Sequence, residues 1–157
     1  MKVKLIVIGK TKSKFLIDGE NEYQKRLRHY CKFSELIIPD IKNGGKLSKK
    51  ELKEKEGNLI LASIKNSDYV TLLDDKGLAL TSIEFSELLN KNMVSSTNEL
   101  VFIIGGAFGL SESVFQRANT KLSLSKMTFS HQMVRMIFKE QLYRAFTILK
   151  GEKYHHE

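Results

Sequence analysis

Several residue types are scarce in this 157-residue sequence, which has one cysteine (Cys31), one proline (Pro39) and no tryptophan. A single thiol excludes an internal disulfide and any metal site built from several cysteines. No apolar run approaches the roughly 20 residues that a helix needs to cross a bilayer. The opening stretch MKVKLIVIGK has no cleavage-like site, so it is typical of a first strand rather than a signal peptide. We therefore expect a cytoplasmic protein.

The length and composition predict a single domain over residues 1–157. A chain of 18.0 kDa is long enough to bury a substantial core. Hydrophobic residues make up 41% and charged residues 28%, a balance typical of folded rather than disordered proteins. We find no internal repeat and no low-complexity linker that would divide the chain.

Positive charge is concentrated at one end of the chain. Lysine and arginine number 26 against 18 acidic residues, which gives a net charge of +8. The first 32 residues contain three acidic side chains and nine basic ones: Lys2, Lys4, Lys10, Lys12, Lys14, Lys25, Arg26, Arg28 and Lys32. Such an asymmetry favours a polyanionic partner, and nucleic acid over an acidic membrane. A solvated basic surface without a partner fits the charge as well.

Short β-branched runs alternate with stretches of helical periodicity. The predicted strands are 3–9, 33–39, 69–74, 99–105 and 121–125, and the predicted helices are 14–30, 48–65, 83–93, 111–118 and 131–150. Capping boxes at Ser48 with Glu51 and at Thr81 with Glu84 open two of the helices. Five strands alternating with five helices predict an α/β fold, a parallel sheet flanked by helices on both faces.

Three polar or glycine-rich segments follow the last three strands. They are 74–77 (DDKG), 105–109 (GGAFG) and 125–131 (SKMTFSH). The carboxyl ends of parallel strands meet at one edge of a sheet, and ligands bind in the crevice outside that edge. We therefore expect these three segments to line a common ligand site.

The glycine-rich segment does not match either of the common nucleotide-binding patterns. Its spacing is G-G-x-x-G rather than G-x-G-x-x-G, and no lysine follows the last glycine as a phosphate-binding loop requires. Glycines would still let a ligand approach the backbone closely. A tight strand-to-helix turn that binds nothing is the alternative.

The last predicted helix carries two pairs of side chains one turn apart. His131 precedes Arg135, and Glu140 precedes Arg144, each by four positions. The second pair fits either a routine surface ion pair or part of a site. The tail with Tyr154 and His155 is either a frayed end or an ordered arm. Adjacent histidines lack the spacing of a helical metal pair, so no metal is predicted.

Several long motifs in the second half of the chain closely resemble one family. They are LLDDKG (72–77), VFIIGGAFGLS (101–111), LSLSKMTFSHQMVRMIFKEQLYRAF (122–146) and YHHE (154–157), with VIGK and LKEKEG (52–57) earlier in the chain. In this order and at these separations they resemble the RlmH family of ribosomal RNA methyltransferases, within the SPOUT superfamily. Many members carry proline where this chain has Ala107 and Ser130. Both positions stiffen loops, so the chemistry is not put in doubt.

The resemblance implies a C-terminal deep trefoil knot, over about residues 69–157, that binds S-adenosylmethionine. Such a knot is an exception to the rule that chains do not thread their own loops. The positions of this chain that match the cofactor-binding positions of the family are Leu73, Gly105, Leu124, Ser125, Lys126, Met127, Thr128 and Phe129.

The resemblance also implies the reaction, which is methyl transfer to N3 of a pseudouridine in large-subunit ribosomal RNA on the assembled ribosome. The candidate catalytic residues are His131, Glu140, Arg144, Tyr154 and His155. A histidine suits proton transfer, and an arginine suits a phosphate or an anionic base. Glu140 would orient Arg144, and Tyr154 would stack on or hydrogen-bond the base. The family implies a homodimer in which the tail reaches the partner's pocket.

Two other functions stay open at this point. One is a non-catalytic RNA-binding or ribosome assembly factor on the same fold, and the other is a SPOUT methyltransferase that acts on tRNA. The polar segment 125–131 and the intact tail argue against the first. The absence of a separate RNA-binding domain argues against the second, by analogy only. A nicotinamide-dependent enzyme is more distant because the dinucleotide fingerprint fails.

Overall fold

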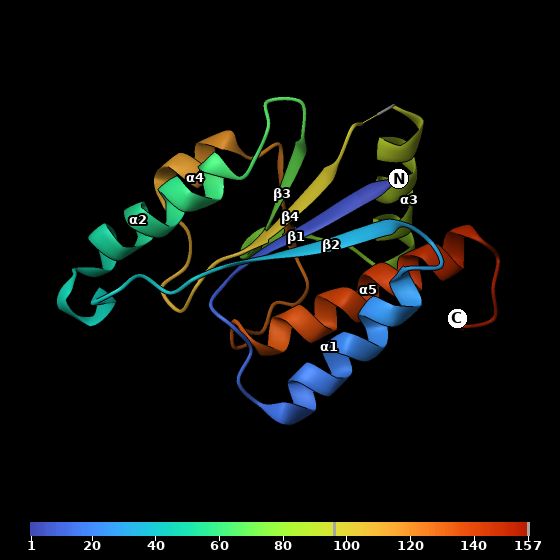
Figure 1. The fold of residues 1–157 in the computed structure, drawn as a ribbon. Helices are drawn as coiled ribbons and strands as arrows, with labels where there is room; N and C mark the ends of the chain where they lie inside the picture. The colour runs from blue at the N-terminus through green and yellow to red at the C-terminus, as the bar shows by residue number, and fades with distance from the viewer. Residues whose placement is uncertain (96, 157) are drawn as a thin grey trace.

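The computed structural model describes residues 1–95 and 97–156 and contains one five-stranded sheet, in the order β2-β1-β4-β3-β5 (Figure 1). All neighbouring strands are parallel. The strands are β1 (Lys2–Ile8), β2 (Lys32–Ile38), β3 (Tyr69–Ala79), β4 (Leu100–Ile104) and β5 (Thr120–Ser123). The predicted parallel sheet is confirmed, and each strand begins within one residue of its predicted start. Glu157, the last residue of the YHHE motif, lies outside the described residues.

Helices cover both faces of the sheet, as predicted (Figure 1). They are α1 (Lys14–Leu27), α2 (Lys49–Ala62), α3 (Ser82–Val94), α4 (Glu112–Arg117) and α5 (Met133–Leu149), with a short 3-10 helix η1 (Gly44–Lys46) before α2. Helices α1, α3 and α5 pack on one face, and α2 and α4 pack on the other. Both predicted capping boxes form. Within the described residues, no helix is long and apolar enough to cross a bilayer.

The core consists of two layers, one on each side of the sheet. Along β1, Val3, Leu5 and Val7 point to the layer under α1, α3 and α5. Ile6 and Ile8 point to the layer under α2 and α4. Strands buried on both faces need continuous apolar runs, which is why β1 and β4 lack polar alternation. All five residues of β4 are buried.

Strand β3 is longer than predicted, ending at Ala79 rather than at residue 74. Its ladder with β5 is interrupted, because Leu73 and Leu78 both pair with Leu122 and residues 74–77 bulge outward between them. A Cβ atom at Gly77 would lie 2.7 Å from the backbone nitrogen of Leu122, so only glycine allows this approach. The polar segment expected after the strand is therefore a bulge inside it.

A buried ion cluster joins α5 to α1 and β2. Lys139 is fully buried, and its Nζ donates to Glu20 Oε2 at 2.6 Å and lies 3.0 Å from Glu35 Oε1. Thr11 Oγ1 donates to the other oxygen of Glu20 at 2.6 Å. Buried charges are tolerated when each one is paired and hydrogen-bonded, as these are. The cluster fixes the position of α5 on the sheet.

Removal of the lysine from this cluster should be strongly destabilising. We expect Lys139→Ala to lower the free energy of unfolding by about 3–5 kcal/mol, because two carboxylates lose their buried counter-charge. The measurement is urea denaturation. Lys14→Ala, which breaks the exposed pair of Lys14 with Asp18, is the control and should have a much smaller effect. Equal losses for the two variants would contradict the buried-cluster account.

Candidate active site

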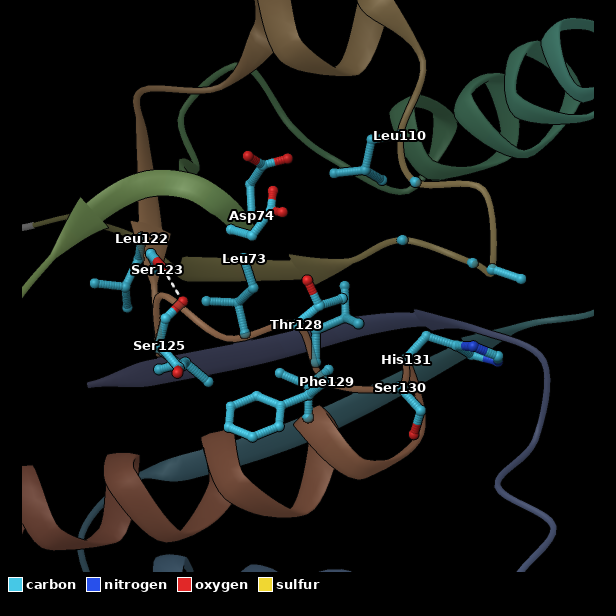
Figure 2. Close-up of a pocket in the computed structure, with 18 of the residues that line it drawn as sticks. Leu73, Asp74, Leu110, Leu122, Ser123, Ser125, Thr128, Phe129, Ser130 and His131 are labelled. Carbon is cyan, nitrogen blue, oxygen red and sulfur yellow. Dashed lines mark hydrogen bonds between the residues drawn. The ribbon is translucent and has the colours of Figure 1, made fainter.

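A cavity of about 430 Å³ lies at the carboxyl edge of the sheet. Its wall is formed by the three segments that were expected to meet there: the β3 bulge, the glycine loop after β4 and the segment after β5 (Figure 2). Figure 2 shows Leu73 and Asp74 on the β3 side, and Thr128, Phe129 and His131 on the segment that leads into α5. This volume is typical of small-molecule sites, which measure about 300–1,000 Å³.

The glycine loop is a tight turn that also forms part of the cavity wall. Gly109 has φ +84°, and its N–H donates to the carbonyl of Gly106 at 3.1 Å. A Cβ atom at Gly105 would lie 2.9 Å from the carbonyl carbon of Gly109. The tight turn is therefore confirmed, and ligand binding by this loop stays a prediction. The turn needs positive φ, and the missing side chains expose the backbone to whatever occupies the cavity.

Serine hydroxyls shape the segment between β5 and α5. Ser123 Oγ donates to the carbonyl of Ser125 at 2.8 Å, and Ser125 Oγ accepts from the N–H of Met127 at 2.9 Å. Ser130 Oγ accepts from the N–H of Met133 at 3.1 Å and so caps the first turn of α5. These hydrogen bonds lead the segment after β5 into the start of α5.

The start of α5 is held against the end of β1 by Arg135, which is only 1% exposed. Its guanidinium donates to the carbonyl of Ile8 at 2.5 Å and to that of Gly9 at 2.8 Å. The predicted helix 131–150 begins two residues early, because α5 starts at Met133 and His131 precedes it. The backbone carbonyl of His131 accepts from Arg135 Nε at 3.1 Å. The arginine therefore fixes the backbone, not the imidazole.

His131 lies between two cavities. It lines the first, and it also lines a second cavity of about 260 Å³ next to the end of β1. Burial lowers the pKa of its imidazole, and the nearby positive charge of Arg135 lowers it further. The neutral ring is therefore the main form at pH 7, and its free nitrogen can accept a hydrogen bond.

Two acidic residues of the β3 bulge, Asp74 and Asp75, also line the first cavity. They were noted in the sequence but not counted as site residues. Their place directly after the buried part of β3 was the signal that could have included them. Over the described parts of the chain, no three histidine, cysteine or acidic side chains are grouped to hold a metal ion.

Four of the five candidate catalytic residues form a cluster of their own. Arg144 Nη2 lies 2.6 Å from Glu140 Oε1, and the guanidinium carbon lies 4.7 Å from the centre of the Tyr154 ring. Tyr154 Oη donates to the same Glu140 oxygen at 3.0 Å. His155 Nδ1 lies 3.5 Å from Arg144 Nη1. The tail is therefore an ordered arm folded onto α5.

This cluster and the first cavity lie at opposite ends of α5. Arg144 is eleven residues beyond Met133, the first residue of the helix, which corresponds to about 16 Å along its axis. Neither Glu140 nor Tyr154 lines the first cavity. Within one copy of the chain, only His131 of the five candidates reaches it.

The comparison with known proteins agrees with this architecture. The family described as "Predicted SPOUT methyltransferase" matches residues 1–155. The chain belongs to the SPOUT methyltransferase family. It is similar to proteins named "Ribosomal RNA large subunit methyltransferase H" from Parabacteroides distasonis, with 54% identity over 157 residues and 100% of both chains, and from Christiangramia forsetii, with 54% identity over 156 residues and 99% of both. The family membership predicted from the motifs is confirmed.

A solved structure supports the fold class. A probable methylase family protein from Haemophilus influenzae Rd KW20 superposes with a TM-score of 0.55 over 99% of this chain and 70% of that one, at 11% sequence identity. At this identity the likeness concerns the fold alone. Membership of a methyltransferase family implies a methyl donor.

The cavity wall includes seven of the eight residues that the family resemblance assigned to the cofactor: Leu73, Gly105, Leu124, Ser125, Met127, Thr128 and Phe129. Lys126 does not line the cavity, and its side chain is exposed. Met127 is 76% exposed, so it is a surface residue at the mouth rather than a core residue.

Substitution of Gly105 should weaken donor binding. We expect Gly105→Ala to weaken it at least about tenfold, or 1.4 kcal/mol, because the added methyl group pushes the glycine loop into the cavity. Isothermal titration calorimetry measures the effect. Gly45→Ala is the matched control, since a Cβ atom there meets nothing within 4 Å. Unchanged affinity in Gly105→Ala would show that the donor binds elsewhere.

Proposed function

We propose that this chain transfers a methyl group from S-adenosylmethionine to N3 of a pseudouridine in large-subunit ribosomal RNA. The observation that carries the proposal is the full-length likeness, at 54% identity, to relatives named for methylation of that RNA. The cavity at the sheet edge gives the reaction a place. The pseudouridine and its N3 atom come from the motif resemblance, as does action on the assembled ribosome in the cytoplasm.

The cavity fits S-adenosylmethionine in size and in charge. When bound, this cofactor supplies a methyl group on a positively charged sulfur. The carboxylates of Asp74 and Asp75 line the cavity and favour a cationic ligand. Backbone groups of the glycine loop and of the segment after β5 are available to bind the adenine. The trefoil knot stays a prediction from the resemblance, and it would hold these loops together.

The residues around the acceptor have distinct tasks in this proposal. Nitrogen N3 becomes a good nucleophile as its proton leaves, so the site must accept a proton or stabilise the anion. His131 is the candidate beside the donor cavity, and its ring is neutral near pH 7. Arg144 suits a phosphate or the anionic base, and Glu140 holds it in place at 2.6 Å.

A second copy of the chain would complete the site. The Arg144 cluster lies about 16 Å along α5 from the end that carries the donor cavity, too far to serve that cavity in the same copy. In a homodimer the cluster of one copy can approach the cavity of the other. This separation supports the predicted dimer, in which Tyr154 and His155 act in the partner's site.

The basic N-terminal region is the proposed contact surface for ribosomal RNA. Several of its positive charges are paired with acidic side chains, so fewer are available to phosphates than the sequence suggested. Lys4 pairs with Glu99, Lys14 with Asp18, and Arg26 with Glu22. Lys10 and Lys12 are exposed and line the second cavity. They are the residues of this region closest to the proposed chemistry, and phosphate contacts of this kind position RNA without reading its sequence.

The test is transfer of a labelled methyl group to large ribosomal subunits that lack the modification, followed by mass-spectrometric location of the label. We expect one labelled nucleotide, a pseudouridine methylated at N3. Label in tRNA instead would favour a SPOUT methyltransferase with that target. Binding to the subunits without any transfer would favour the non-catalytic assembly factor, and either result would overturn the proposal.

A further inference from the structure

The second cavity adjoins the donor cavity and shares part of its wall. Gly106, Ala107 and His131 line both. The rest of the second cavity comes from the end of β1, the residues after β2 and the inner side of α2. A group bound there would therefore be separated from the donor cavity only by shared residues.

Glu56, on α2, lines this second cavity and is only 8% exposed. No residue among those described donates a hydrogen bond to its carboxylate or forms an ion pair with it. The other buried glutamate, Glu20, receives hydrogen bonds from both Lys139 and Thr11. The carboxylate oxygens of Glu56 keep access to the cavity, because among the described residues no fully buried side-chain oxygen or nitrogen lacks a hydrogen-bond partner. A ligand in the cavity that brings a hydrogen-bond donor can therefore reach this carboxylate.

The glycine at position 106 leaves room for the side chain of Glu56. A Cβ atom at Gly106 would lie 3.2 Å from Glu56 Oε2, so the glycine lets the carboxylate reach the wall that both cavities share. The other charged or titratable side chains that line the cavity are Lys10, Lys12, Asp40 and His131. Burial raises the pKa of Glu56, and repulsion from the nearby negative charge of Asp40 raises it further.

We infer that the second cavity receives the acceptor base and that the Glu56 carboxylate accepts the hydrogen of its imide N–H. This inference rests on the proposed function. An imide edge offers one N–H donor between two carbonyl oxygens, and the donor is what Glu56 lacks. The exposed Lys10 and Lys12 supply positive charge at the same cavity for the carbonyl oxygens or the adjoining phosphate.

The chemical step balances with Glu56 as the proton acceptor in place of His131, which lies between the two cavities. The N–H proton passes to the carboxylate, and its electron pair stays on nitrogen. That pair forms the new nitrogen–carbon bond to the methyl group. The bond from methyl to sulfur breaks, and its pair remains on sulfur, which becomes neutral. The proton then leaves Glu56 for solvent, which restores the carboxylate.

Glu56→Gln tests the inference, with Glu54→Gln on the exposed side of the same helix as the control. For both variants, methyl transfer to unmodified large ribosomal subunits and affinity for S-adenosylmethionine are measured. We expect Glu56→Gln to slow transfer about 100-fold or more and to leave the affinity unchanged. Glu54→Gln should transfer at the wild-type rate.

Stability provides a readout that does not depend on catalysis. Because the folded pKa of Glu56 is raised, the folded state holds this proton more tightly than the unfolded chain, whose glutamate pKa is about 4.3. The contribution of Glu56 to the free energy of unfolding is therefore full below the pKa of the unfolded chain. It falls as the pH rises from that pKa through the higher pKa of the folded state. Glu56→Gln should remove this fall, so it should be no less stable than wild type at neutral pH.

Each other outcome overturns the inference in a distinguishable way. Wild-type transfer by Glu56→Gln would exclude the carboxylate while the proposed function stands. A parallel loss of cofactor affinity or of stability would show that Glu56 serves the fold or the donor cavity. An equal loss in Glu54→Gln would show an effect of α2 as a whole. Absence of transfer by the wild type would end the proposed function, and the inference with it.

Discussion

The position of one buried guanidinium determines most of the site. Arg135 lies in the first turn of α5 and donates to the carbonyls of Ile8 and Gly9 at the end of β1. It therefore ties the start of α5, which follows β5 at one edge of the sheet, to β1. The backbone N–H of Lys12 donates to the side-chain Oε1 of Gln132 at 2.9 Å. With both ends of the segment after β5 fixed, by pairing with β3 and by Arg135, the loop between them can form a cavity wall of constant shape.

Buried charge has two different uses in this chain. Around Lys139 every charge has a partner, and the cluster holds α5 on the sheet. At Glu56 a buried carboxylate lacks a donor and faces a cavity. The Lys139 cluster stabilises the fold, whereas the Glu56 carboxylate is available to bind a ligand. This difference is expected, because functional sites often keep groups that do not stabilise the folded state. His131 lines both the cavity at Glu56 and the first one. Under the proposed function, both reactants of the methyl transfer would meet near His131.

Local patterns predicted much of the fold, and long-range contacts account for what they missed. Two capping boxes and the apolar runs placed the strands and helices, because these signals lie within a few residues of each other. The extension of β3 could not be predicted, because it depends on Leu122 pairing twice across a bulge. The sequence spacing relates Arg135 only to His131, and its other carbonyl partners, Ile8 and Gly9, lie more than 120 positions away. Seven of the eight residues that the resemblance gave to the cofactor line the first cavity, and cofactor binding by them stays a prediction. Glu56 was not a candidate in the sequence, because its place at a cavity depends on α2 lying near the glycine loop.

The most direct test of the central claim is calorimetric titration with S-adenosylmethionine. It compares the wild-type chain with Arg135→Met and uses NADH as the control ligand. The claim is that Arg135 holds the three loops as a cavity for this cofactor. It predicts saturable binding of S-adenosylmethionine alone to the wild type, and binding at least about tenfold weaker, or 1.4 kcal/mol, to a variant that circular dichroism shows to be folded. Equal affinity in the folded variant, or no preference over NADH in the wild type, would contradict it.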